Sequence, residues 1–213
     1  MYLLRVDASI QGDRSASSAL ADGVVDRFTA THPGFPVVRR HLGQDPLPAD
    51  AWAAAISASF TPEDERSEHQ REATATAEQL ATELQQASSA VLALPLYNFG
   101  VSQHVKAWID LAMAGAPLGA RLLEGTPTVV VTTRGGAYGP GTPREGWDHN
   151  TDYLRRVLAD CWGADLTVVE REFTLVGVNP ALDQFTDLAA DMHRDAEAHA
   201  TRAGETLAAR HAA

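Results

Sequence analysis

Short apolar runs alternate with longer amphipathic segments along the whole chain. Strands are expected where β-branched and apolar residues cluster, at 2–6, 37–42, 89–96, 126–133 and 165–173. The run SAVLALPL (89–96) is continuously apolar, as expected for a central strand covered on both faces. Helices are expected at about 17–30, 51–59, 61–86, 102–114, 150–162 and 180–210. This alternation predicts an α/β protein with a five-stranded parallel sheet between two helical layers.

Two local patterns add detail to the predicted helices. Thr61 is expected to cap the helix that runs to about Gln86, because Pro62 and three acidic residues follow it. Cys161, in the stretch LADCWGA, is expected to be a small buried residue near the end of its helix. No repeat or linker interrupts the 213 residues, so a single domain over 1–213 is expected.

Composition excludes some classes of function. The net charge of −11 leaves no surplus of lysine and arginine for tracking a phosphate backbone, so nucleic acid is not an expected partner. The first apolar run is too short for a signal peptide or a membrane span. A single cysteine is typical of a reducing compartment, and we therefore expect a cytoplasmic protein. The sequence contains no recognisable catalytic triad or set of metal ligands, so no metal is expected.

In a doubly wound sheet, ligands bind at the carboxyl ends of the strands. This rule selects the loops after the first, third and fourth strands. The first loop holds Ser9, Arg14, Ser15 and Ser17 at the start of a helix, where hydroxyls and free amides favour an anion. Simple capping by Ser15 or Ser17 explains the serines equally well. The loop has neither the Walker A nor the dinucleotide glycine pattern.

The other two loops offer flat and close-fitting surfaces. The segment PLYNFG presents an amide at Asn98 and aromatic rings at Tyr97 and Phe99, which suit a planar heterocycle. Alternatively, the aromatic side chains cap the core and Asn98 forms a turn. The pair Gly135 and Gly136 lets the backbone approach a ligand, or forms only a mobile turn.

Taken in order, these motifs resemble those of the FMN-dependent azoreductases, a quinone-reductase family with a flavodoxin-like fold. The resemblance rests on Ser9 with the S-A-S of 15–17, PLYNF at 95–99, KAWID at 106–110 and TRGG at 133–136. It implies that phosphate is held by Ser9, Arg14, Ser15, Ala16 and Ser17. It implies that the flavin ring is bordered by Pro95, Leu96, Tyr97, Asn98, Phe99, Thr133, Arg134, Gly135 and Gly136. Lys106 and Asp110 are expected to form a pair that supports the fold.

The chain departs from the resembled family at two places. Ala16 stands where that family commonly has an amide side chain, which removes one donor to the phosphate. The segment 111–127 is short and has no aromatic residue, although the family often builds part of its substrate pocket there. Tyr138, Trp147 and His149 are therefore expected to supply walls for the substrate, with ordinary loop packing as the alternative for the last two.

The resemblance implies an FMN-dependent NAD(P)H oxidoreductase. NADH or NADPH would reduce FMN by hydride transfer, and a quinone or an azo compound would then take the two electrons. A homodimer is also implied. Two alternatives stay open: a flavodoxin that transfers electrons without its own NAD(P)H activity, and a flavodoxin-like partner protein that has lost its cofactor.

Overall fold

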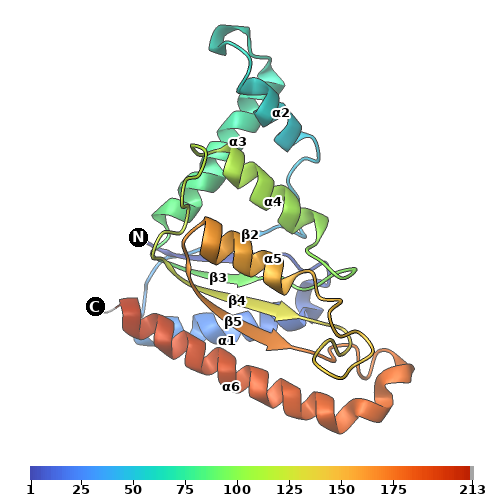
Figure 1. Ribbon diagram of the computed structural model, residues 1–213. Coiled ribbons are helices and arrows are strands. Elements are labelled where there is room, and N and C mark those ends of the chain that lie inside the picture. The colour runs from blue at the N-terminus through green and yellow to red at the C-terminus, as the bar shows by residue number, and fades with distance from the viewer. Residues whose placement is uncertain (212–213) are drawn as a thin grey trace.

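The computed structural model describes residues 1–211. Its core is a parallel sheet in the order β2-β1-β3-β4-β5. Both predictions about the sheet, its five strands and their parallel direction, are confirmed (Figure 1). The strands are β1 (Leu3–Asp7), β2 (Val37–His41), β3 (Ser89–Ala93), β4 (Pro127–Thr133) and β5 (Asp165–Arg171).

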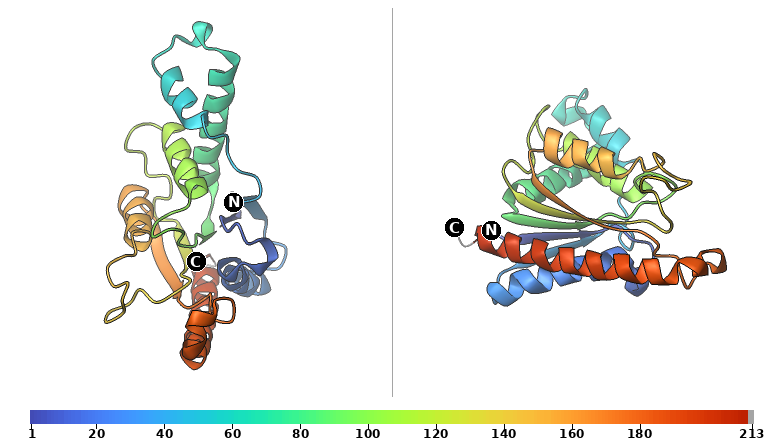
Figure 2. Two further views of the ribbon diagram at one scale, coloured as in Figure 1. Left: turned by 90° about the vertical axis from the view of Figure 1, so that its right-hand side faces the viewer. Right: turned by 60° about the horizontal axis from the view of Figure 1, so that its bottom comes forward.

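Helices cover both faces of this sheet. On one face, α1 (Ala16–Thr31) packs beside α6 (Thr186–His211), and the first turn of the predicted last helix is a 3-10 helix, Pro180–Phe185. The other face carries α3 (Glu68–Gln86), α4 (Gln103–Ala114) and α5 (Thr151–Arg155). The short α2 (Ala51–Ala58) packs on α3, and these two extend away from the sheet (Figures 1 and 2).

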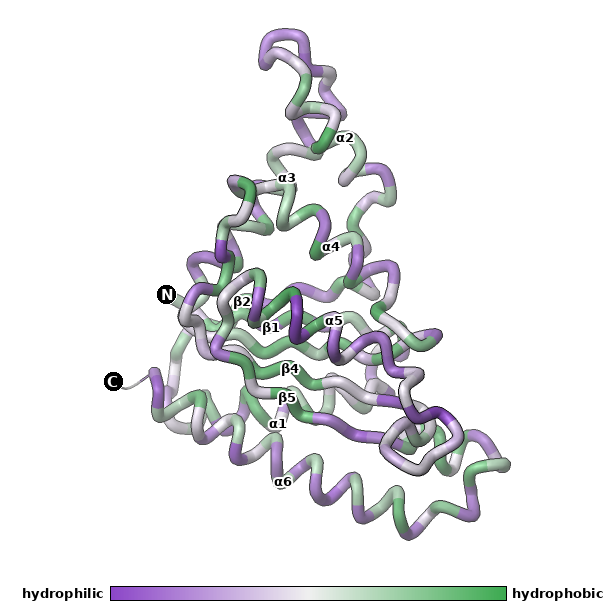
Figure 3. The backbone as a smooth tube through the Cα atoms, in the orientation of Figure 1, coloured by the Kyte–Doolittle hydropathy of each residue, from purple (hydrophilic) through white to green (hydrophobic). Residues whose placement is uncertain are grey.

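The three central strands, β1, β3 and β4, are buried because apolar side chains fill the space on both sides of them. Phe28 on α1 is fully buried among residues of β1, β3 and β4 on one side. On the other side, the rings of Trp108 and Trp162 meet edge to face with centroids 5.5 Å apart. The hydropathy colouring shows the consequence, with apolar strands inside and mixed colours along the outer helix α6 (Figure 3). The predicted pair is also present, with Lys106 Nζ 2.6 Å from Asp110 Oδ1.

The predicted start of α3 is wrong. Ser67, not Thr61, caps this helix, and its hydroxyl accepts from the Gln70 amide while the Gln70 side chain accepts from the Ser67 amide. This reciprocal capping box satisfies two free amides at once. Pro62 is extended, with ψ at 142°, and Glu63–Glu65 forms a separate 3-10 turn. The acidic run therefore lies before the helix rather than in its first turn.

The predicted burial of Cys161 is also wrong, because this thiol is exposed. The helix that begins with α5 continues as a π-helical segment, Arg156–Cys161. Hydrogen bonds from residue i to i+5 turn the later residues around the axis relative to α-helical spacing. Trp162, the next residue, is buried in its place.

The order of the strands fixes where a ligand can bind. The chain moves outward from β1 to β2 and then returns to β3 on the other side of β1. The connections leaving β1 and β3 therefore run in opposite directions and leave a crevice at their carboxyl ends. Within residues 1–211, each helix is too short or too polar to cross a bilayer.

Candidate functional site

A cleft of about 410 Å³ lies at this crevice. Its volume falls within the roughly 300–1,000 Å³ typical of small-molecule sites. The three loops selected from the sequence all contribute to it, together with the segment that follows β5. Twelve of the predicted site residues line the cleft: Ser9, Arg14, Ser15, Ala16, Ser17, Pro95, Leu96, Tyr97, Asn98, Thr133, Gly135 and Tyr138.

The start of α1 forms one end of the cleft. Ser15 is the cap residue of α1, and its hydroxyl accepts from the Ser18 amide at 3.1 Å. The hydroxyls of Ser15 and Ser17 lie 3.1 Å apart and both side chains are buried. The first backbone bond within the helix runs from the Ala19 amide to the Ser15 carbonyl, and the Ser18 amide is taken by the cap, so the Ala16 and Ser17 amides are left for a ligand. Hydroxyls, amides and the helix dipole together suit an anion.

Tyr97 connects the first loop to the middle loop. Its phenol oxygen lies 3.2 Å from Ser9 Oγ and accepts from the Ile10 amide at 3.2 Å. Ser9 Oγ in turn accepts from the Gln11 amide at 3.2 Å. The Tyr97 hydroxyl therefore fixes the spacing between two walls of the cleft, a role that the sequence did not suggest.

The middle loop makes a tight reversal just after Leu96. Tyr97 and Gly100 exchange two backbone hydrogen bonds of 3.0 Å around Asn98 and Phe99. The two central residues have positive φ angles of 48° and 70°, as in a type I′ turn. Such angles are rare for residues other than glycine and are found more often at functional sites. The turn keeps Asn98 in the cleft wall and turns the Phe99 ring outward.

Arg134 is buried behind the third wall of the cleft, the wall formed by the loop after β4, and it bonds to several residues there. Its Nε donates to Asp148 Oδ2 at 2.6 Å, and its Nη1 donates to Glu170 Oε2 at 3.0 Å. Its Nη2 donates to Thr151 Oγ1 at 2.9 Å. The guanidinium thereby ties the end of β4 to the start of α5 and to the end of β5. Its side chain does not line the cleft, because these partners hold it inside.

The same network reaches the cleft through the backbone of Tyr138. Glu172 lies 3.7 Å from the Arg134 guanidinium and accepts from the Tyr138 amide at 2.9 Å. Burial alone would raise the pKa of Asp148, but hydrogen bonds from Thr151 and Asn150 and the charge of Arg134 lower that pKa below its usual value. Asp148 is therefore a firmly ionised partner for the guanidinium.

The two glycines of the third loop lie under side chains from other segments. A Cβ at Gly135 would lie 2.6 Å from Leu175 Cδ1, and a Cβ at Gly136 would lie 3.2 Å from Arg144 Nη1. Both glycines have negative or extended φ angles, so the need for glycine here is close packing rather than turn geometry. Leu175 and Arg144 form part of the cleft lining themselves.

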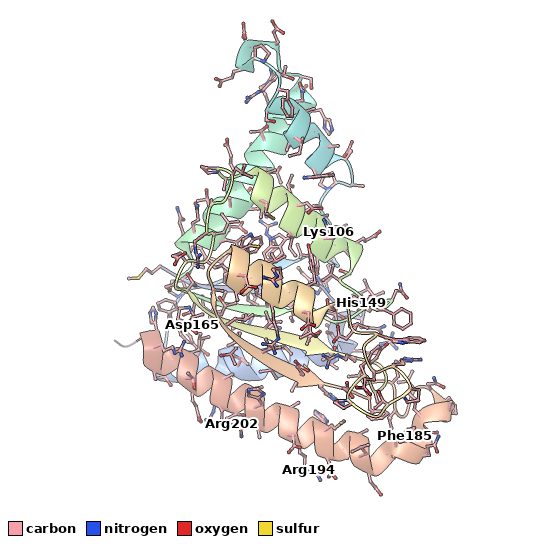
Figure 4. The ribbon with its side chains drawn as sticks, in the orientation of Figure 1. Lys106, His149, Asp165, Phe185, Arg194 and Arg202 are labelled. Atoms are coloured by element: carbon pink, nitrogen blue, oxygen red, sulfur yellow. The ribbon has the colours of Figure 1, made fainter. Side chains whose placement is uncertain are left out.

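Five predicted site residues lie beside the cleft without lining it. The Phe99 ring packs edge to face against Trp147, with centroids 5.5 Å apart, and lies 6.4 Å from the Tyr138 ring. The amide of His149 donates to the Phe99 carbonyl at 2.9 Å, and His149 lies near the start of α5 (Figure 4). These contacts are loop packing, the alternative considered for Trp147 and His149. The five residues are Phe99, Arg134, Gly136, Trp147 and His149.

Sequence reasoning missed five residues that line the cleft. Gln11 lies in the first loop, where its neutral amide stands out less than the hydroxyls and the arginine. Thr174, Leu175 and Val178 follow β5, and the loop after β5 is not one of the three selected loops because it lies away from the strand reversal. For Arg144, the sequence shows only an arginine inside a long loop rich in glycine and proline. These residues are Gln11, Arg144, Thr174, Leu175 and Val178.

Comparison with known proteins agrees with this architecture. Residues 1–200 match a family model described as a flavodoxin-like fold, so the chain belongs to that class of proteins. An azoreductase structure from Bacillus anthracis superposes with a TM-score of 0.78, covering 97% of this chain and 100% of that one. Their sequence identity is 20%, so this likeness concerns the fold alone.

Closer relatives define the family within that class. A protein of Frankia alni is 40% identical over 191 residues, which cover 87% of this chain and 90% of the relative. A protein of Streptomyces avermitilis is 34% identical over an alignment of 220 positions, which covers 97% of this chain and 99% of the relative. Both are named FMN-dependent NADH:quinone oxidoreductase. The chain belongs to the family of FMN-dependent NADH:quinone oxidoreductases.

Proposed function

We propose that this protein is an FMN-dependent enzyme that transfers two electrons from NADH to a quinone. The observation that carries the proposal is the cleft to which three separate loops at the strand reversal contribute, with serine hydroxyls and a helix start at one end. The names of relatives that match most of the chain support the same cofactor and substrates.

The residues of the cleft fit the two chemically different halves of FMN. A phosphate would be held by Ser9, Ser15 and Ser17, by the free amides at the start of α1 and by the charge of Arg14. Ala16 contributes only its backbone there. The ring would lie against Leu96, Tyr97, Asn98, Thr133 and Gly135, which supply amides, an amide side chain and apolar surface.

Bound FMN would supply the chemistry of taking a hydride from NADH and passing two electrons to an acceptor. Overall, NADH, one proton and a quinone give NAD⁺ and a hydroquinone; the hydride carries two electrons and solvent supplies the second proton. The protein itself binds and orients the reactants. The open side of the cleft carries the apolar side chains of Leu175 and Val178, which would pack against the bound reactants.

Two measurements test this function. The purified protein should take up added FMN and acquire a yellow flavin spectrum, and it should then oxidise NADH steadily when a quinone is present. A colourless protein that takes up no FMN contradicts the proposal. A protein that binds FMN but does not turn over NADH would instead be an electron-transfer flavodoxin. A parallel assay with NADPH shows which nicotinamide cofactor the protein prefers. A parallel assay with an azo dye tests whether azo compounds also accept the electrons.

We also propose that the protein is a homodimer. Four exposed apolar side chains surround the open side of the cleft, with 40% to 73% of their surface accessible, and a second copy would shield such a rim from water. They are Phe99, Trp147, Leu175 and Val178. Light scattering after size-exclusion chromatography gives the mass directly, and a monomer at all concentrations contradicts this proposal. The cytoplasmic location stays a prediction that fractionation of the native host tests.

A further inference from the structure

The Arg144 side chain is exposed, but it folds back over the start of the third loop. Its Nη1 donates to the Tyr138 hydroxyl at 3.3 Å, and its Cζ lies 5.5 Å from the centroid of the Tyr138 ring. A Cβ at Gly136 would lie only 3.2 Å from the same Nη1. A guanidinium over an aromatic ring is held by electrostatic attraction and stacking. The backbone glycine and the tyrosine thus place a cation in the cleft wall.

The charge of Arg144 is not neutralised by a neighbour. Among residues 1–211, no carboxylate forms an ion pair with it, whereas Arg134 in the same loop contacts three. The neighbouring Glu145 instead accepts from the Gly141 amide. In a chain with a net charge of −11, an uncommitted cation lining the cleft attracts negative charge to that wall.

The cleft has two such cations, at different ends. Arg14 immediately precedes Ser15, the cap residue of α1, and so belongs to the end with the serine hydroxyls. Arg144 contacts Gly136 and Tyr138, two residues from the loop after β4. That loop lies next to the middle loop, because β3 and β4 are neighbours and the Leu96 amide donates to the Thr133 carbonyl at 3.0 Å.

We propose that Arg144 faces the ring of bound FMN and makes the flavin easier to reduce. This inference rests on the proposed function. A flavin gains negative charge when it is reduced, so a nearby cation stabilises the reduced form more than the neutral oxidised form. Arg144 is then a tuning residue for the flavin, while Arg14 serves the phosphate. Because the side chain is exposed, added salt weakens the effect.

Titrations with two flavins separate the ring from the phosphate. Riboflavin has the ring of FMN but lacks its phosphate. Arg144→Gln is expected to lower the affinity for reduced FMN about tenfold more than the affinity for oxidised FMN, which corresponds to a midpoint potential roughly 30 mV lower. Arg144→Lys keeps the charge, and its midpoint potential is expected to lie between those of Arg144→Gln and the wild type. Arg14→Gln, the matched control, is expected to weaken FMN several-fold while leaving riboflavin affinity and the potential unchanged.

Three results would overturn the inference. The potential of bound FMN could be the same in Arg144→Gln and the wild type. Arg144→Gln could weaken FMN but not riboflavin, which would place this cation at the phosphate. Or the substitution could change only the KM for an anionic quinone, which would assign Arg144 to the acceptor. If the wild type binds neither flavin, the proposed function itself fails, and this result is separate from the other three.

Discussion

Arg134 Nε donates to Asp148 Oδ2 across 2.6 Å, and this bond joins two ends of the same loop, 14 residues apart. Both side chains are largely buried, with 7% and 14% of their surfaces accessible. Every residue that the loop lends to the cleft, including Tyr138 and Arg144, lies between these two anchors. The shape of the third wall therefore depends on an ion pair that does not itself line the cleft.

Replacing Arg134 by glutamine is expected to lower the free energy of unfolding by about 3 kcal/mol, because it leaves the partly buried carboxylates of Asp148 and Glu172 without their partner. Urea unfolding measures the loss. Arg155→Gln is the control, since Arg155 lies 3.6 Å from the same Glu170 but is half exposed, and its loss is expected to be below about 1 kcal/mol. Equal losses in the two variants would show that Arg134 contributes no more than a surface pair.

The lowered pKa of Asp148 predicts how stability changes with pH. Burial opposes ionisation, but the Thr151 and Asn150 hydrogen bonds and the charge of Arg134 outweigh it. Because the folded pKa lies below the unfolded value of about 3.9, the carboxylate stabilises the fold above that pH. This stabilisation is lost as the pH falls through the lower folded pKa.

Asp148→Asn removes the stabilisation by the Asp148 carboxylate, and the free energy of unfolding is expected to fall by about 2 kcal/mol at pH 7. The difference between wild type and variant, measured by urea unfolding, should shrink as the pH is lowered from 5 toward 3. Asp160→Asn, at an exposed surface pair with Arg156, serves as the control and is expected to cost below about 0.5 kcal/mol at pH 7. A constant difference for Asp148→Asn across this range would contradict the predicted linkage.

Tyr97→Phe tests the link between the first and middle loops. Loss of the hydroxyl is expected to cost about 1 kcal/mol of stability and to weaken FMN about fivefold, because Ser9 and the Ile10 amide lose their common partner. Tyr2→Phe removes a comparable bond, from the Tyr2 hydroxyl to the Glu83 carbonyl at 2.8 Å, far from the cleft. Fluorescence titration of FMN should separate the two, and identical FMN affinities would rule out the link.

Gly135→Ala tests the packing of the third wall. The new methyl group overlaps Leu175 Cδ1, so Leu175 must move into the cleft, and FMN affinity is expected to fall about tenfold. Adding Leu175→Ala should restore most of the affinity by removing the displaced side chain. Gly100→Ala, where no atom lies within 4 Å of the new Cβ, is the control and should leave affinity unchanged. An unaffected Gly135→Ala variant would mean that this wall does not touch the ligand.

The sequence predicts the framework well because the framework rests on local patterns. Buried strands such as Ser89–Ala93 are continuous apolar runs, and helices show a helical spacing of apolar residues. The rule for the position of ligand sites in parallel sheets then selects three of the loops that form the cleft. The ends of helices are harder to predict from sequence than their presence. For α3, Pro62 and the acidic residues after it indicate a start at Thr61, but the capping box of Ser67 and Gln70 sets the start further along the chain.

The orientation of side chains in the cleft depends on contacts between distant residues, which one sequence does not display. Arg134 looks like a ligand-binding arginine beside two glycines, yet its partners lie 14 and 36 positions further along the chain. Phe99 looks like a ring that faces a ligand, yet its positive φ turns it toward Trp147. The Tyr97 ring suggests a flat binding surface, whereas its hydroxyl makes the contacts that join two of the loops.

The arrangement above Gly135 and Gly136 has a consequence for the size of molecules that the protein admits. The backbone of this wall is anchored, but part of its inner surface is formed by the side chains of Leu175 and Arg144, which lie over Gly135 and Gly136. Rotation about their side-chain bonds changes the aperture by whole atoms while the sheet stays still. The width of the molecules that the cleft admits is therefore expected to depend on the rotamers of these two side chains.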